Sequence, residues 1–317
     1  MNSIRLQLSW LLIAALLTAC SPSLFSSSGL QALPEPTATV LPPSITPSAT
    51  PLPPTPTATE TPLPTTTATS TLTPTASPTP TRTTTATWAY QAAGEVQAPI
   101  LLYHHIALPD KTNRYYVSPE SFRQQMEYLF QQGYTTLTPS QLREVIIFGG
   151  EMPARPVVIT FDDGNLSVYQ NAYPVMQEFG FIGTIYLVSN YLEAENFLTS
   201  EQVLEMANSG WEIGSHGASH IDLSMNHDFI RKELVDSYLK IQEITGQPVK
   251  SLAYPFGKTD EFVMLKAQDY GYTTGMGLGT STIHTAGNLF YLNRLEIKAD
   301  YDLVKFASLL PWSSASP

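Results

Sequence analysis

The sequence predicts an α/β fold with a parallel sheet, open or closed into a barrel, in the last two-thirds of the 317-residue chain. From about Val96 onward, short apolar runs rich in β-branched residues alternate with segments of helical periodicity. Ser or Thr caps open several of these helical segments, and glycines close them. Repeated strand–helix units require parallel neighbouring strands, and they place functional residues at the carboxyl ends of those strands.

Residues 1–20 are expected to be a lipoprotein signal peptide. Arg5 supplies the positive start, and the apolar run over 10–17 is too short to span a bilayer. The closing Leu-Thr-Ala-Cys resembles a bacterial lipobox, in which Cys20 becomes the lipidated first residue; an ordinary signal peptide is the alternative. Because Cys20 is the only cysteine, disulfides and thiolate metal sites are excluded. We therefore expect an exported chain, lipid-anchored to the outer face of a bacterial membrane in the cell envelope.

Residues 21–95 are expected to form a disordered linker. Pro, Thr, Ser and Ala dominate this stretch, and aromatic residues are nearly absent. Such a composition buries too little apolar surface to offset the entropy of ordering the chain. A polyproline-like tether of this length, at about 3.1 Å per residue, would reach on the order of 200 Å.

The charge of the chain is concentrated in residues 96–317, the predicted domain. That segment holds 14 basic and 24 acidic residues, for a net charge of −10. An acidic domain argues against nucleic acid as a partner, and against a strongly anionic glycan unless a local basic patch intervenes.

The first strand–helix units of the domain are marked by apolar runs and by caps. Residues 99–103 form an apolar strand, and a Ser-Pro pair opens a helix over 118–132. Thr138 and Gln141 form a capping box that opens a second helix. The run at 156–161 is β-branched without helical periodicity, which predicts a buried strand.

The same alternation continues to residue 297. Helices are predicted over 168–179, 199–210, 228–245 and 261–270. Strands are predicted over 184–189, 211–214, 252–254, 273–276 and 292–297. The helix at 228–245 is amphipathic, and the expected core face comprises Ile230, Leu234, Leu239 and Ile241.

Residues able to carry chemistry follow the ends of these strands. Thr-Phe-Asp-Asp-Gly ends the strand at 156–161, His-Gly-Ala-Ser-His follows another strand, and Tyr-Pro-Phe-Gly a third. Alone, each has an ordinary explanation as a turn, a surface pair or a loop. Together at one edge of a sheet, two imidazoles and one carboxylate supply three ligands for a divalent metal. The second carboxylate is left as a base, which predicts metal-assisted hydrolysis.

At this point the domain resembles the polysaccharide deacetylases (NodB homology), carbohydrate esterase family 4. Residues 160–164 match the family's first motif, T-F-D-D-G, and residues 215–220 match its second, S/T-H-x-x-x-H. The resemblance covers nearly all of residues 96–300 and implies a distorted (β/α) barrel of about seven strands. It implies Asp162 as the catalytic base, and Asp163, His216 and His220 as the metal ligands.

Two departures from the family pattern concern the remaining catalytic groups. Ala253 stands where the third motif usually has Arg, and the family's Asp-Trp motif is absent. The Leu-x-His motif lies at the start of the domain, ending at His104, which resembles the biofilm-exopolysaccharide (poly-N-acetylglucosamine) branch. We therefore expect His104 rather than His284 to be the acid, and Arg294 is a candidate to replace the missing Arg. His105 should face away from His104, because adjacent strand residues point to opposite sides.

The resemblance also implies the reaction. One divalent metal ion, zinc before cobalt or nickel, would activate water for attack on an N-acetyl carbonyl. The backbone N–H of Phe256 would stabilise the oxyanion by family analogy, with Tyr254 beside the substrate. The expected substrate is an N-acetylglucosamine polysaccharide: poly-N-acetylglucosamine, chitin-like or peptidoglycan. A monomer is expected, bound to the membrane only through its lipid anchor.

Three alternatives remain open from the sequence. Ala253 and the missing Asp-Trp motif are compatible with a tethered, catalytically impaired glycan-binding pseudoenzyme. A glycosidase would need two carboxyl groups about 5–9.5 Å apart across a bond, whereas adjacent Asp162 and Asp163 splay apart. A metalloprotease is disfavoured because no His-Glu-x-x-His occurs.

Overall fold

The computed structural model of the chain describes residues 87–108 and 113–312. Cys20, the predicted signal peptide and most of the predicted linker lie outside these residues. In the described part of the chain, no helix combines the length and apolar character needed to cross a membrane.

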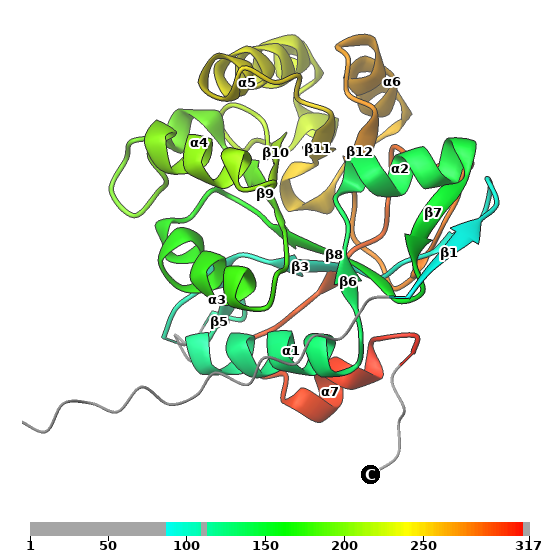
Figure 1. The fold of residues 1–317 in the computed structure, drawn as a ribbon. Helices are drawn as coiled ribbons and strands as arrows, with labels where there is room; N and C mark the ends of the chain where they lie inside the picture. The colour runs from blue at the N-terminus through cyan, green and yellow to red at the C-terminus, as the bar shows by residue number, and fades with distance from the viewer. Residues whose placement is uncertain (1–86, 109–112, 313–317) are drawn as a thin grey trace, which may run out of the picture. The chain divides into compact units, whose positions relative to one another are not determined.

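A parallel sheet forms the centre of the domain (Figure 1). Its strands, in spatial order, are β12 (Thr274–Met276), β11 (Ser251–Ala253), β10 (Glu212–Ser215), β9 (Thr184–Leu187), β8 (Pro156–Phe161), β3 (Ile100–Tyr103) and β14 (Leu295–Glu296). The short β6 (Thr135–Thr136) pairs with the amino-terminal end of β8. All these pairings are parallel, as the alternation of strands and helices predicts.

The segment before β14 pairs with β12, the strand at the opposite end of the sheet. Met276 of β12 forms a parallel bridge with Leu292. The Leu292 N–H donates to the Gly275 carbonyl at 2.8 Å, and the Gly277 N–H donates to the Leu292 carbonyl at 2.9 Å. These bonds bring the two ends of the sheet together, so the expectation of a distorted barrel of about seven strands is confirmed.

Helices surround the strands (Figure 1). They are α1 (Pro119–Gln131), α2 (Pro139–Phe148), α3 (Tyr173–Glu178), α4 (Ser200–Asn208), α5 (Ile230–Thr245), α6 (Glu261–Asp269) and α7 (Leu303–Ser308). Ser118 caps α1, and Thr138 and Thr199 form capping boxes at α2 and α4, which confirms the predicted starts of these helices. Gly246 ends α5 with φ +66°.

Two predicted helices differ from the structure in detail. The segment predicted at 168–179 begins as a π-helical turn, Val168–Ala172, and only then continues as α3. Pro174 has no N–H to donate, so the first turn cannot hold a regular hydrogen-bond pattern there. In α5, Leu239 is 58% exposed rather than part of the core face, whereas Ile230, Leu234 and Ile241 are buried as expected.

Three two-stranded pairings lie outside the main sheet. They are β1 (Trp88–Gln91) with β7 (Gly150–Pro153), β2 (Val96–Gln97) with β13 (Ile283–His284), and β4 (His105–Ile106) with β5 (Tyr116–Val117). The linker was predicted to extend to residue 95, but β1 pairs with β7 along its whole length. Trp88–Gln91 therefore belongs to the folded domain rather than to the linker.

The central strands are buried on both faces, with successive side chains on opposite sides. On β8, Val157, Ile159 and Phe161 pack in the larger apolar cluster, which includes the core faces of α1, α3 and α4. Val158 packs in a second cluster with residues of β3, β9, β11, β12 and α2. We identify this second cluster as the barrel interior, and α2 contributes to its core. The alternation sets which side chains reach the open rim of the barrel.

Candidate active site

The inward-facing side chains of two central strands continue into a polar group at the rim. Val158 is inward on β8, and the next inward positions along the chain are Thr160 and Asp162. On β3, Ile100 is inward, and the same period leads to His104. Strand periodicity alone therefore directs Asp162 and His104 toward a common space above the barrel core.

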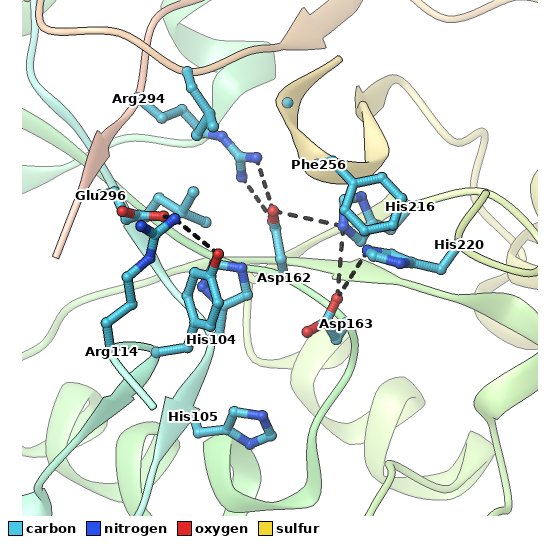
Figure 2. A pocket seen from close by; sticks show the side chains of 14 residues that line it. His104, His105, Arg114, Asp162, Asp163, His216, His220, Phe256, Arg294 and Glu296 are labelled. Atoms are coloured by element: carbon cyan, nitrogen blue, oxygen red, sulfur yellow. Dashed lines mark hydrogen bonds and ion pairs between the residues drawn. The ribbon is translucent and has the colours of Figure 1, made fainter. Parts of the chain in front are cut away.

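A cavity of about 240 Å³ occupies this rim, and the predicted groups line it (Figure 2). Its lining includes His104, Asp162, Asp163, His216, His220 and Arg294. Phe256, Tyr115 and His105 border the same cavity. The structure thus gathers residues that are as much as 190 positions apart in the sequence, between His104 and Arg294.

Asp163, His216 and His220 aim their ligand atoms at one point. The Asp163 Oδ1 lies 3.6 Å from the His216 Nε2 and 3.6 Å from the His220 Nε2. All three ligand atoms lie within 4.8 Å of one another. Metal bonds of about 2.1 Å in a tetrahedral arrangement separate ligand atoms by about 3.4 Å. The donor set and its spacing therefore fit one small divalent cation.

A hydrogen bond from the strand behind it orients His216. The His216 Nδ1 lies 2.8 Å from the Ala253 carbonyl oxygen, so Nδ1 carries the proton and donates it to that oxygen. This arrangement leaves Nε2 unprotonated and directed at the carboxylates. Burial lowers the pKa of His216, which favours the neutral imidazole that binds a cation.

The backbone at the site lies in conformations that L residues rarely adopt. Of the five non-glycine residues with positive φ in the described chain, three border this cavity: Asp163 (φ +74°), His220 (φ +59°) and Phe256 (φ +61°). Each such residue costs on the order of 1–3 kcal/mol, unless surrounding contacts compensate for it. Strain of this kind concentrates at functional sites. Here the unusual backbone turns the side chains of these three residues toward the cavity.

Arg294 pairs with Asp162 deep in the cavity. Its Nη1 and Nη2 donate to the two Asp162 carboxylate oxygens at 2.6 and 2.7 Å, and the arginine is 1% exposed. Burial alone would raise the pKa of Asp162, but the Arg294 guanidinium and His216 outweigh it and lower that pKa to about 2. Asp162 is therefore an oriented, ionised carboxylate at neutral pH. Among the described residues no guanidinium pairs with Asp163, and burial raises its pKa.

His104 lies beside Asp162, on the side opposite His216 and His220 (Figure 2). The Tyr115 ring packs against its imidazole with 4.5 Å between ring centroids. Burial lowers the pKa of His104 to about 4, so the imidazole is neutral at pH 7. The neighbouring His105 stacks on Tyr116 at 4.1 Å and remains half-buried at the edge of the cavity.

His284, the alternative acid, lies elsewhere. It belongs to β13 at the margin of the barrel, is fully buried, and its Nε2 lies 3.0 Å from the Ala98 carbonyl oxygen. It does not line the cavity. Of the two histidines, only His104 is therefore placed to reach a group bound beside Asp162.

The two residues predicted to contact the substrate near the third motif differ in position. Phe256 is 55% exposed, and its ring packs against the His220 ring with 4.5 Å between centroids. The Tyr254 side chain is fully buried, and its hydroxyl donates to the Phe290 carbonyl at 2.9 Å. Because Ala253 faces the barrel interior, the next residue faces the helices. The Tyr254 side chain therefore points away from the cavity, and a role of this residue beside the substrate stays a prediction.

Comparison with known proteins identifies the family to which the chain belongs. The family described as polysaccharide deacetylase matches residues 149–275. YxkH of Bacillus subtilis (strain 168), a protein named after that family, is 30% identical over 200 residues, covering 63% of this chain and 71% of YxkH. The poly-β-1,6-N-acetyl-D-glucosamine N-deacetylase of Staphylococcus aureus (strain MRSA252) is 26% identical over 203 residues, covering 59% of this chain and 69% of that protein.

A solved structure has a similar fold over most of its length. The Streptococcus pyogenes deacetylase PplD in complex with acetate is 25% identical, with a TM-score of 0.62. The match covers 68% of this chain and 98% of PplD. On the strength of its relatives, the chain belongs to the polysaccharide deacetylase family, the hydrolases of carbohydrate esterase family 4.

Proposed function

We propose that this chain is a metal-dependent hydrolase that removes acetyl groups from an N-acetylglucosamine polysaccharide and releases acetate. The observation that supports the proposal most is the convergence of three cation ligands and a separate ionised carboxylate on one cavity. A bound cation and a separate base within reach of one carbonyl can together promote hydrolysis of an amide.

Asp163, His216 and His220 would hold the cation, which we infer to be zinc, with cobalt and nickel as alternatives. When bound, the cation supplies Lewis acidity toward a carbonyl oxygen and makes water more acidic. Nitrogen and carboxylate oxygen ligands without thiolate suit all three metals. Reloading the stripped chain with each metal in turn distinguishes them.

Asp162 would accept the proton of the attacking water. The Arg294 pair keeps this carboxylate ionised and fixes both of its oxygens, one of which also lies 3.7 Å from the His216 Nε2. A carboxylate that is already ionised and oriented needs no reorganisation before the attack.

His104 would complete the reaction on the leaving nitrogen. As the carbon–nitrogen bond breaks, the sugar nitrogen needs a proton to leave as a neutral amine. His104 is neutral in the free chain because burial lowers its pKa to about 4. In the proposal, it takes up, during the reaction, the proton that Asp162 has accepted from the water, and delivers that proton to the leaving nitrogen. The Phe256 N–H would donate to the developing oxyanion.

The name of one relative and the net charge of the domain narrow the range of candidate substrates. The Staphylococcus aureus relative carries poly-β-1,6-N-acetyl-D-glucosamine in its name, and that polymer is uncharged until it is deacetylated. A net charge of −10 over residues 96–317 favours a neutral glycan over an anionic one. We therefore place poly-N-acetylglucosamine ahead of chitin-like chains and peptidoglycan.

The placement of the enzyme in the cell is part of the same proposal. Lipidation of Cys20 would anchor the chain at the outer face of a bacterial membrane, and the Pro/Thr-rich tether would let the domain reach extracellular glycan. Cys20→Ser should abolish incorporation of labelled palmitate into the full chain. Incorporation at the wild-type level would exclude this anchor.

A catalytically impaired, glycan-binding pseudoenzyme is the second candidate, because Ala253 stands where the family usually has Arg. The position of Arg294 weighs against it. The guanidinium of Arg294, the residue directly before β14, reaches Asp162 in the bidentate geometry that a base-orienting arginine would need.

The deciding experiment measures acetate and free amine from acetylated β-1,6-glucosamine oligomers, chitooligosaccharides and peptidoglycan fragments. The chain is stripped by a chelator and reloaded with zinc, cobalt or nickel. We expect acetate release only after reloading, with Asp162→Asn keeping the metal but losing most turnover, and His216→Ala losing both. His284→Gln serves as a control that stays active. Binding of the oligomers without acetate release would instead identify the pseudoenzyme.

A further inference from the structure

One buried carboxylate near the cation ligands is unused by the proposed reaction. Glu233 on α5 is 3% exposed and does not line the cavity. No salt bridge joins it to a cationic side chain of the described residues. A buried charge without a counter-charge is costly, unless several donors satisfy it.

The donors that satisfy Glu233 all come from the loop between the two histidine ligands. Its Oε2 accepts the Ala218 N–H at 2.9 Å and the Ser219 N–H at 2.8 Å. Its Oε1 accepts the Ser219 hydroxyl. Two successive backbone N–H groups directed at one oxygen form an anion-binding concavity, which here is filled by a side chain of the same protein.

The loop can take this shape only because of its first residue. Gly217 has φ +79°, and a Cβ added there would lie 3.1 Å from the Glu233 Oε2. A side chain at this position would strain its own backbone and would require the Glu233 carboxylate to shift by a few tenths of an ångström. His220 at the far end of the loop has φ +59°, so the curvature continues to the second ligand.

A second contact from α5 holds the near end of the loop. Ser237, one helical turn after Glu233, shares a 2.8 Å hydrogen bond with the Ser215 hydroxyl. The Gly217 N–H donates to that same Ser215 oxygen at 3.1 Å. One face of α5 thus supports the chain on both sides of His216, one residue before it and two residues after it.

From these contacts we propose that Glu233 is a positioning residue of the cation site. It fixes the loop that sets the separation and direction of the His216 and His220 imidazoles, so that these imidazoles are arranged before a cation arrives. The inference rests on the proposed function only in taking these histidines as cation ligands. Groups that orient ligands in this way are commonly worth about 10- to 100-fold in metal affinity.

The test compares three variants by zinc affinity, measured by competition with a chromophoric chelator on the full chain. Glu233→Leu removes the acceptor, and we expect zinc to bind about 10- to 100-fold more weakly. Glu233→Gln keeps an oxygen for the two backbone donors, so its affinity should stay within about 3-fold of wild type. Leu234→Ala is the matched control, because it destabilises the same helix from a buried position and leaves the hydrogen bonds between Glu233 and the loop in place.

Unfolding in the presence of a chelator separates support of the loop from loss of fold. Leu234→Ala should lower the free energy of unfolding and leave zinc affinity unchanged, whereas Glu233→Leu should lower both. Zinc affinity of Glu233→Leu equal to wild type, or reduced only as much as in Leu234→Ala, would overturn the inference. If Glu233→Leu does not fold, Ser219→Ala decides, since it removes one of the three bonds; an unchanged zinc affinity in that variant would overturn the inference. A wild-type chain that binds none of zinc, cobalt and nickel would instead overturn the proposed function.

Discussion

Replacing Arg294 by methionine should destabilise the domain far more than the loss of one ordinary contact. Arg294 is 1% exposed and donates two short bonds to Asp162, which is itself 3% exposed. Without the guanidinium, the carboxylate stays buried with its main counter-charge removed. Breaking a buried pair from one side costs about 3–5 kcal/mol. That is a large share of the roughly 5–15 kcal/mol that stabilises a typical domain.

The position of the Asp162 pKa supports this magnitude. It lies at about 2 instead of 3.8, although burial alone would raise it. Each pKa unit corresponds to about 1.4 kcal/mol, so pairing overcomes the cost of burial and leaves roughly 2 kcal/mol in favour of the ionised form. The contribution is present above pH 3.8 and is lost as the pH falls toward 2.

The assay is urea unfolding at pH 7 in the presence of a chelator, followed by tryptophan fluorescence. Arg294→Met should lose about 3–5 kcal/mol. Asp162→Asn combined with Arg294→Met should be more stable than Arg294→Met alone, because the double variant buries no charge at this place. A loss below about 1 kcal/mol in Arg294→Met would refute this explanation of the pair. So would a double variant whose loss of unfolding free energy equals or exceeds the sum of the losses in the two single variants.

Three further predictions concern the rest of the domain. His284, fully buried with its pKa lowered from 6.5 to about 4, should make the protein less stable as the pH falls from 6.5 to 4, since the unfolded chain binds the proton more tightly. His284→Gln should remove on the order of 3 kcal/mol of that loss, seen as a flatter plot of unfolding free energy against pH. Gly257→Ala should distort the Phe256 turn and lower turnover at least 10-fold, because its φ is +66° and an added Cβ would lie 2.4 Å from the Leu278 Cγ. A chain beginning at residue 96 should be less stable than one beginning at residue 87, because removing Trp88–Gln91 leaves β7 without its partner strand.

Each of these three has an outcome that contradicts it. A plot for His284→Gln that parallels wild type would mean that His284 does not titrate in this range. Turnover of Gly257→Ala near that of wild type, with an unchanged melting temperature, would mean that the turn tolerates the methyl group. Equal melting temperatures for the two shortened chains would mean that β1 adds nothing to the fold.

The elements and the ligand group could be predicted because local rules determine them. Caps at Ser118, Thr138 and Thr199 open helices where expected, and β-branched runs become buried strands. Parallel strands end at one rim, so residues that follow different strands, such as Asp163 and His216, meet there. The period of two then directs Asp162 and His104 inward.

Other features depend on contacts that no local pattern encodes. Arg294 reaches Asp162 across 132 residues of sequence, and only the closure of the barrel brings them together. Trp88–Gln91 follows a Pro/Thr-rich stretch, and its strand forms only because β7 is available to pair with it. Side chains alternate between the two faces of a strand, so an inward Ala253 implies that the Tyr254 side chain points away from the cavity. Glu233 has no signal beyond being an acidic residue on the buried side of an amphipathic helix.

Anomalous scattering at the zinc edge, from crystals of the chain grown with zinc, tests the central claim most directly. We predict a single strong peak within bonding distance of the Asp163 oxygen and the His216 and His220 nitrogens, and its loss in His216→Ala. A chain that releases acetate from the glycan with no metal at these three side chains would contradict it.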